Sequence, residues 1–288
     1  MEVPADFNWN QELETAVEAA REAGAIIKRF YDRVDAALYT KSDGSPVTDA
    51  DLAADAAIRS VLRERFPGDA LLTEESGDDL ARLSAERCWI VDPLDGTDQF
   101  VARTGQFDVF IALIVAGRPV VGVALHPPSG LICLAAAGVG AWVEREGRRE
   151  PLVFAPVERG MPVRLVTSVW YGVPDSLPAL TRVNEELGGE GEPPIIRTGL
   201  NPRDWLKEHR THDALAGLVP GVMSGGEWDL AAPDLIVNEA GGVYTDARGT
   251  LHRYNKPDPR NGGGLAIAVD SVTHQRLLTA LAPRLVTT

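Results

Sequence analysis

The chain of 288 residues has little positive charge, since 28 lysine and arginine residues stand against 42 aspartate and glutamate residues. The formal net charge is -14. Such a surface repels the phosphates of nucleic acids, so we expect no nucleic-acid polymer as a partner. A small phosphate ester can still bind where metal ions neutralise acidic side chains locally.

Cysteine and long apolar runs are also scarce. Cys88 and Cys133 each lie in an apolar stretch typical of a strand, so we expect buried thiols rather than a disulfide scaffold. The longest nearly uncharged run, residues 130–143, is too short to span a bilayer. Residues 1–10 are acidic and do not have the basic and apolar parts of a signal peptide. We therefore expect a cytoplasmic protein without a membrane partner.

Apolar spacing predicts two helices followed by a mostly antiparallel sheet. Residues 10–31 and 48–65 carry apolar side chains at helical intervals. The strands predicted to follow are residues 88–91, 107–115, 120–125, 131–136 and 140–144. This order describes an N-terminal α+β domain, residues 1–155.

A proline-rich stretch, residues 151–162, marks a soft boundary to a C-terminal α/β domain, residues 156–288. Its predicted strands are residues 163–167, 242–246 and 265–269, and its clearest helices are residues 229–240 and 273–281. The region from Tyr171 to Gly225 is rich in glycine, proline and charge, and its pattern does not assign its elements.

Carboxylates are grouped where the chain has turns. Asp92 and Asp95 follow directly on a buried strand, and Gly96 after them allows a close backbone approach. Glu74 lies in a polar stretch upstream, and Asp229 precedes an apolar helix. Clustered carboxylates hold hard divalent metals such as magnesium, which can neutralise the oxygens of a phosphate ester.

Each of these features alone has a common structural explanation. Glu74 with Glu75 can be a solvated surface pair, the Asp92–Thr97 segment can be a turn, and Asp229 can cap a helix. Their occurrence together and in this order is what favours a metal site. The sequence contains no P-loop, no dinucleotide fingerprint and no nucleophile elbow.

In this order the motifs resemble those of the inositol monophosphatase family, within the lithium-sensitive, magnesium-dependent phosphatases. The matching segments are residues 41–51, 74–76, 89–97, 227–232 and 239–242. The resemblance implies a layered α/β/α/β/α sandwich and a phosphomonoesterase with two or three Mg²⁺ ions. It also implies, by family analogy alone, a homodimer.

The resemblance assigns a role to each matching residue. Metal ligands would be Glu74, Asp92, Asp95, Asp229 and the carbonyl of Leu94. Glu74 and Thr97 would orient and deprotonate the attacking water, with Asp49 near a weaker third metal. Substrate would lie against Gly96, Thr97, Asp98 and Asp229, the amides of Gly96 and Thr97 holding its phosphate. Attack would be direct and in line, without a phosphoenzyme.

The substrate is less well defined, because the segment after Gly96 resembles the 3'(2'),5'-bisphosphate nucleotidase branch but has Asp98 where that branch usually has lysine. The substrate-binding glutamate of the inositol branch falls on Val222. We expect His209 and His212 to be solvated helix residues rather than a metal pair, and we hypothesise that Lys207 or Arg210 reaches a substrate phosphate.

Two functions remain open beside hydrolysis of an inositol monophosphate or related sugar or polyol phosphate. One is a bisphosphate nucleotidase acting on 3'-phosphoadenosine 5'-phosphate. The other, of a different class, is a non-catalytic regulator that binds metal or phosphate. The complete ligand set disfavours the regulator, because a non-catalytic relative tends to lose one of its ligands.

Overall fold

A computed structural model describes residues 8–42, 44–170, 175–196, 201–206, 210–218 and 225–285. The chain forms two compact units. Unit 1 comprises Met1–Pro151, Glu227–Ile236 and Tyr254–Pro259, and unit 2 comprises the remaining segments. The units therefore differ from a single division after residue 155, because the segment with Asp229 packs with the first half of the chain. The predicted two-domain division stays a prediction.

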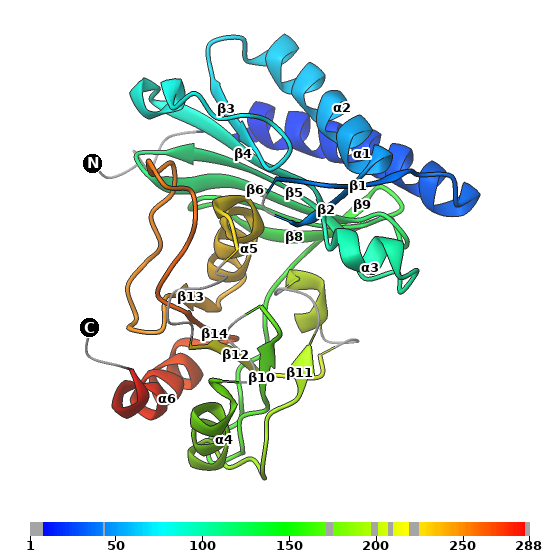
Figure 1. Ribbon diagram of the computed structural model, residues 1–288. Helices are drawn as coiled ribbons and strands as arrows, with labels where there is room; N and C mark the ends of the chain where they lie inside the picture. The colour runs from blue at the N-terminus through cyan, green and yellow to red at the C-terminus, as the bar shows by residue number, and fades with distance from the viewer. Residues whose placement is uncertain are drawn as a thin grey trace. The chain divides into compact units, whose positions relative to one another are not determined.

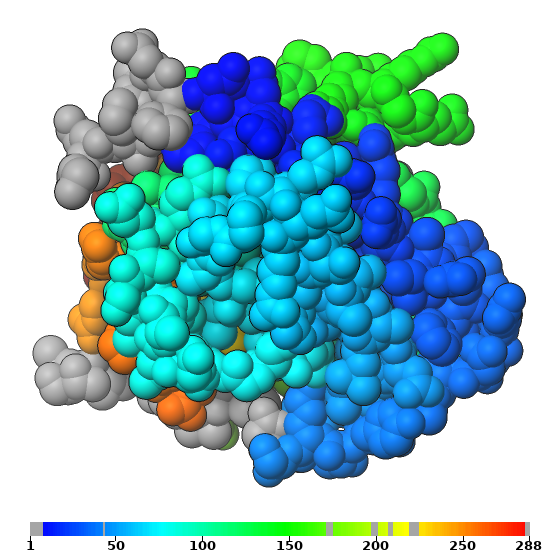
Figure 2. All heavy atoms as spheres, turned by 90° about the horizontal axis from the view of Figure 1, so that it is seen from above, coloured from blue at the N-terminus to red at the C-terminus, as the bar shows by residue number. Residues whose placement is uncertain are grey.

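Two helices form the outer layer of unit 1, as the apolar spacing predicts: α1 (Asn10–Arg33) and α2 (Asp49–Arg65). The buried face of α1 is rich in alanine, and this lets it pack closely on α2 and on the sheet below. Thr48 begins α2 with a capping box, in which the side chain of Asp51 accepts a hydrogen bond from the Thr48 amide. Figure 2 views this layer from outside, with α2 in light blue near the centre.

A seven-stranded sheet lies beneath these helices in strand order β3-β4-β5-β6-β7-β8-β9 (Figure 1). β3 and β4 are parallel and every other neighbouring pair is antiparallel. The predicted strands of this half are all present. Their bounds are β3 Ala70–Thr73, β4 Arg87–Asp95, β5 Asp108–Val115, β6 Arg118–His126, β7 Leu131–Ala136, β8 Gly140–Arg145 and β9 Arg148–Pro151.

The other face of the sheet carries α5 (Glu227–Glu239), which passes over β6 at Gly122. A Cβ atom at Gly122 would lie 3.0 Å from the carbonyl oxygen of Ala232, so glycine is what permits this close packing. The helix begins two residues before Asp229, and its approach to the sheet therefore helps to place that carboxylate.

Short elements surround this core of unit 1. The hairpin of β1 (Leu38–Thr40) and β2 (Pro46–Thr48) contains the predicted turn, although Asp43 lies outside the described residues. The short helix α3 (Thr97–Val101) follows β4, and the 3-10 helix η1 (Ala81–Ser84) precedes it. Cys88 and Cys133 are buried free thiols on β4 and β7, as predicted.

Unit 2 contains a five-stranded mixed sheet in the order β11-β10-β12-β14-β13. Its strands are β10 Leu165–Ser168, β11 Ile195–Ile196, β12 Ala214–Gly217, β13 Val243–Thr245 and β14 Leu265–Ala268. Two helices, α4 (Leu177–Glu186) and α6 (Ser271–Leu281), pack together and bury apolar residues against this sheet. The short 3-10 helices η2 (Pro202–Trp205) and η3 (Ala282–Arg284) complete the described elements.

None of the helices in the described part of the chain is long and apolar enough to cross a bilayer.

Candidate metal and active site

Asp92 and Asp95 lie at the end of β4, where the strand pairing with β5 is irregular. The Asp92 carboxylate accepts a hydrogen bond from the amide of Leu94 at 2.9 Å, which bends the backbone around the side chain. Gly96 then turns the chain with φ +85°. A Cβ there would lie 2.9 Å from the Gln106 carbonyl oxygen, so this turn needs glycine on both grounds.

Carboxylates from three separate elements meet at this turn. Glu74 follows β3, Asp92 lies on β4 and Asp229 lies in the first turn of α5. One ligand oxygen from each lies within 4.8 Å of the other two. All three residues belong to unit 1, although 155 positions separate Glu74 from Asp229 in the sequence.

Burial and mutual repulsion make these charges costly. Burial raises the pKa of Asp92 well above its usual range, and the nearby charges of Glu74, Asp95 and Asp229 raise it further. Burial likewise raises the pKa of Asp95, with the Asp229 charge as the next cause. Among the described residues, Asp95 is outside the group of three within 4.8 Å, but the charges of Asp229 and Glu74 in that group raise its pKa as well.

This donor set fits a hard divalent cation. The groups are oxygen donors, they lie close to one another and they carry the same charge, with Asp92 buried and Glu74 and Asp229 half-buried. A divalent cation between them would remove the repulsion, and magnesium prefers carboxylate ligands of this kind. The residues present are therefore suited to the Mg²⁺ that the motifs predict.

The start of α5, and with it Asp229, is fixed by Glu227. This fully buried carboxylate accepts hydrogen bonds from the amides of Asn255 and Lys256 and pairs with the Lys256 ammonium at 2.5 Å. The side chain of Asn255 in turn accepts from Arg82 in η1 at 2.7 Å. A polar network therefore joins the segment after Glu74 to the segment before Asp229.

A polarised hydroxyl lies at the start of α3. Thr97 Oγ1 donates to Asp51 Oδ1 at 2.8 Å and lies 3.3 Å from the Leu94 carbonyl oxygen. Burial raises the pKa of Asp51, while hydrogen bonds from Thr48 and Thr97 oppose this shift. Because the Thr97 proton is directed at Asp51, its oxygen lone pairs remain available as acceptors.

Sequence reasoning gave Asp51 no catalytic role, although one signal pointed to it. Asp51 is the third helical residue after Thr48, the position from which a capping-box carboxylate reaches back to the helix start. One of its oxygens makes that cap while the other accepts from Thr97. Glu74, which the motifs pair with Thr97 and also name as a metal ligand, lies among the three clustered carboxylates, and its pairing with Thr97 stays a prediction.

Lys41 and Glu75 are further neighbours without a predicted role. The Lys41 ammonium lies 2.7 Å from Glu74 Oε1 and 2.8 Å from Glu75 Oε1. Burial lowers the pKa of Lys41, but the two carboxylates outweigh it and raise the pKa above its usual value. Burial raises the pKa of Glu75 to about 7.

Two residues with predicted roles, Asp49 and Asp98, make hydrogen bonds to nearby parts of the chain. Asp49, at the first position of α2, accepts from the Ala37 amide at 3.0 Å and from the Tyr39 hydroxyl at 3.1 Å, tying the hairpin to the helix. Asp98 accepts from the amide and the side chain of Gln99. A role for Asp49 near a third metal, and for Asp98 at the substrate, stays a prediction.

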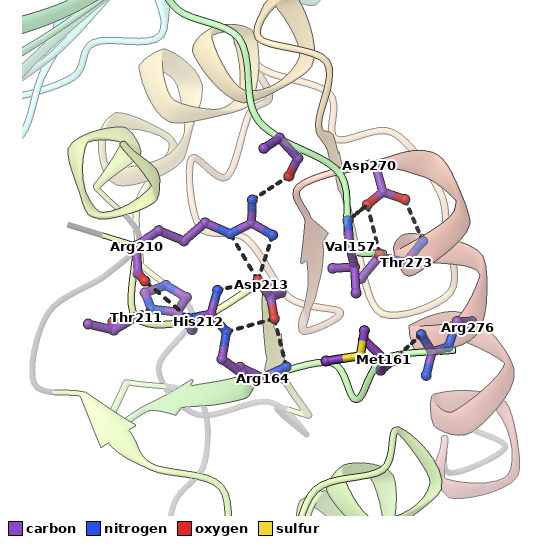
Figure 3. Close-up of polar contacts among 11 residues, drawn as sticks. Val157, Met161, Arg164, Arg210, Thr211, His212, Asp213, Asp270, Thr273 and Arg276 are labelled. Atoms are coloured by element: carbon purple, nitrogen blue, oxygen red, sulfur yellow. Dashed lines mark hydrogen bonds and ion pairs between the residues drawn. The ribbon is translucent and has the colours of Figure 1, made fainter. Parts of the chain in front are cut away.

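In unit 2, Arg210 is committed to a salt bridge. Figure 3 shows Arg210 and Arg164 both directed at the carboxylate of Asp213, each with a nitrogen 2.6 Å from Oδ1. Arg210 also donates to the Ala155 carbonyl. These contacts occupy the side chain that was hypothesised to reach a substrate phosphate. The other candidate, Lys207, lies outside the described residues.

The prediction that His212 is a solvated helix residue is wrong. His212 lies before β12, it is 3% exposed, and its ring packs edge-on against Trp205. Burial lowers its pKa to about 4, so the ring is neutral at physiological pH. His209 and Val222 lie outside the described residues.

The site in unit 1 has the parts of a metal-dependent hydrolase. Oxygen ligands for divalent cations lie beside a threonine whose hydroxyl proton is held by a buried aspartate. Metal ions at such a cluster activate water and neutralise the oxygens of a phosphate group.

Comparisons with known proteins agree with this class. The model of the inositol monophosphatase family matches residues 8–182 and 213–285. The 3'(2'),5'-bisphosphate nucleotidase CysQ of Escherichia coli (strain K12) is 34% identical over 259 residues, which cover 89% of this chain and 99% of that protein. The histidinol-phosphatase of Mycobacterium tuberculosis is 30% identical over 282 residues, covering 94% and 98%.

The fold agrees as well. The crystal structure of CysQ from Bacteroides thetaiotaomicron, at 29% identity, superposes with a TM-score of 0.72 and covers 91% of this chain and 98% of that one. The chain belongs to the inositol monophosphatase family. It is a metal-dependent phosphatase with the α/β sandwich fold of that family, as its motifs predict.

Proposed function

We propose that this phosphatase hydrolyses the phosphate monoester of a small polyol or sugar, such as an inositol monophosphate, with Mg²⁺. The observation that carries the proposal is the cluster of Glu74, Asp92 and Asp229 beside the hydroxyl of Thr97. Asp98, one residue further on, favours a substrate with a single phosphate, since an acid here repels a second one.

The proposed roles follow from this placement. Bound Mg²⁺ ions, two or three in number, would supply positive charge for the phosphate oxygens and for the leaving group and would acidify water. Glu74, Asp92, Asp95, Asp229 and the Leu94 carbonyl are the proposed ligands.

Proton transfer is proposed for Thr97 and Asp51. Thr97 Oγ1 accepts the proton of the attacking water while its own proton moves toward Asp51, to which it already donates at 2.8 Å. Glu74 orients that water. The reaction needs no enzyme nucleophile, because water attacks phosphorus directly and in line with the leaving oxygen.

Substrate binding is proposed at the turn into α3. The first amides of a helix have no acceptor within the helix, and the positive φ of Gly96 turns the chain at this point. The amides of Gly96 and Thr97 would hold the phosphate, with Asp229 and Asp98 beside the alcohol part. Asp49 would lie near the weaker third metal.

A second candidate is a 3'(2'),5'-bisphosphate nucleotidase. It is favoured by the 34% identity to CysQ of Escherichia coli over 89% of this chain, and by the spacing of phenylalanine and glycine after Thr97. For this substrate a cation elsewhere in the site would have to balance Asp98.

Phosphate release from a substrate panel tests both candidates. The panel contains inositol 1-phosphate, 3'-phosphoadenosine 5'-phosphate, fructose 1,6-bisphosphate and histidinol phosphate, each with Mg²⁺ and with EDTA. We expect turnover of inositol 1-phosphate that is lost with EDTA and in Asp95→Asn. Turnover of 3'-phosphoadenosine 5'-phosphate alone would select the second candidate.

A folded, metal-binding protein without turnover on the whole panel would contradict the proposal and favour the non-catalytic regulator. Thr97→Val is the matched variant, since it keeps the shape and removes the hydroxyl; we expect it to bind Mg²⁺ and to lose most turnover. We further propose a cytoplasmic homodimer, which cell fractionation and light scattering would check.

A further inference from the structure

Lys41 occupies a place that concerns the metal site directly. It lies in the turn of the β1–β2 hairpin, which the Lys41 amide closes by donating to the Ser45 carbonyl at 2.8 Å. Its side chain is 17% exposed and extends from the hairpin to the segment after β3. There its ammonium lies within 3 Å of both Glu74 and Glu75.

Glu74 is shared between this ammonium and the carboxylate cluster. Its Oε1 pairs with Lys41 at 2.7 Å, and one of its oxygens lies within 4.8 Å of ligand oxygens on Asp92 and Asp229. An ammonium is a donor without a lone pair and cannot be a metal ligand, while it repels a cation nearby. Lys41 and a metal ion therefore compete for the carboxylate of Glu74.

Glu75 is a second partner of Lys41 and is not one of the three clustered carboxylates. Its side chain is only 4% exposed, and its oxygen lies 2.8 Å from the ammonium. When Glu74 turns to a metal ion, Lys41 can stay paired with Glu75. The base of the hairpin is held independently, because Asp49 binds Tyr39 and the Ala37 amide.

We propose that Lys41 is a tethered counter-ion of the metal site, which neutralises Glu74 in the metal-free protein and yields it to the incoming Mg²⁺. The inference rests on the proposed function in one respect, namely that Glu74 is a metal ligand. Lys41 then sets how much Mg²⁺ is needed to fill the site, and it keeps the metal-free site from carrying the whole of its negative charge.

Magnesium titration of Lys41→Met tests this. We expect calorimetry to show Mg²⁺ binding tighter by roughly tenfold, because a charge-assisted hydrogen bond no longer has to be given up and the repelling charge is gone. In EDTA we expect the same variant to melt at a lower temperature than the wild type, because Glu74 and Glu75 have lost their cation. At saturating Mg²⁺ the difference in melting temperature should shrink.

Two further variants serve as controls. Lys41→Arg keeps the positive charge, so it should still compete with Mg²⁺ for Glu74 and bind Mg²⁺ about as tightly as the wild type. Lys28→Met removes the same charge from an exposed pair with Asp32 on α1, so neither Mg²⁺ affinity nor melting should change appreciably.

Equal or weaker Mg²⁺ binding by Lys41→Met, alongside normal binding by the wild type, would overturn the role of Lys41. A lower melting temperature by the same amount with and without Mg²⁺ would also overturn it, since that is the signature of a structural ion pair. Failure of the wild type to bind Mg²⁺ at all would instead contradict the proposed function.

Discussion

The clustered carboxylates should destabilise the protein when no metal is bound, and Asp92→Asn should relieve this. Asparagine keeps an oxygen to accept from the Leu94 amide, as Asp92 does at 2.9 Å. Its amide group can donate to the neighbouring carboxylate of Asp229. The substitution therefore removes a charge with little loss of packing or hydrogen bonding.

Coulomb's law sets the size of the effect. Two unit charges 4.8 Å apart in an effective dielectric constant of about 20 repel by about 3 kcal/mol. Lys41 offsets part of the charge on Glu74, so most of the repulsion removed comes from one charge's worth of the remaining neighbours, Asp95 and Asp229. We expect Asp92→Asn to raise the free energy of unfolding in EDTA by about 3 kcal/mol.

Chemical denaturation in EDTA and in Mg²⁺ measures the effect. In EDTA the variant should be the more stable protein. With Mg²⁺ the order should reverse, because a ligand present at about 1,000 times its dissociation constant stabilises the wild type by about 4.1 kcal/mol, which exceeds the gain of the variant, and the variant has lost a metal ligand.

The pH dependence of the stability difference checks whether the charge on Asp92 is its cause. Because burial and neighbouring charges raise the pKa of Asp92, the carboxyl destabilises the fold above its unfolded-state pKa, and this penalty is relieved as the pH falls and the group takes up a proton. The advantage of Asp92→Asn in EDTA should thus diminish toward acid pH. An Asp92→Asn protein that is less stable than the wild type in EDTA at neutral pH would refute the reasoning.

Three further substitutions test contacts away from the metal ligands. Arg118→Met leaves the fully buried Asp234 without its 2.9 Å ion pair and should cost about 3–5 kcal/mol in urea denaturation, while adding Asp234→Asn should recover part of the loss. Burial raises the pKa of Asp213, but hydrogen bonds from two arginines outweigh it and lower the pKa to about 2. Asp213→Asn should therefore cost about 2 kcal/mol at neutral pH, a difference that persists down to the unfolded-state pKa and vanishes as the pH falls to about 2. Gly122→Ala should lower the free energy of unfolding by about 1–3 kcal/mol, since its Cβ would press on the Ala232 carbonyl at 3.0 Å; unchanged thermal melting would contradict that packing.

The sequence determined the elements whose apolar patterns are local. The two N-terminal helices follow from spacing at 3.6 residues per turn, and α1 ends within two residues of its predicted end at 31. β4 to β8 follow from short apolar runs separated by turn residues. The ordered motifs identified the family, because a cluster of rare segments in one order does not arise by chance.

The sequence did not locate side chains that act through distant partners. Arg210 had the charge expected of a phosphate-binding residue, but Asp213 and the Ala155 carbonyl hold its guanidinium in the fold. His212 had the spacing of a helix face, but burial against Trp205 made it a neutral core residue. In each case the tertiary contacts of the polar side chain decided whether it was exposed, paired or buried.

The same distinction runs through the metal site. Residue type and motif order were enough to name Glu74, Asp92, Asp95 and Asp229 as candidate ligands. Only the tertiary structure showed that Thr97 donates to Asp51 and that Lys41 pairs with Glu74, because these contacts join segments 46 and 33 positions apart. Local sequence fixes what a side chain can do chemically, whereas packing fixes which charges meet, since Coulomb energy depends on distance in space and not along the chain.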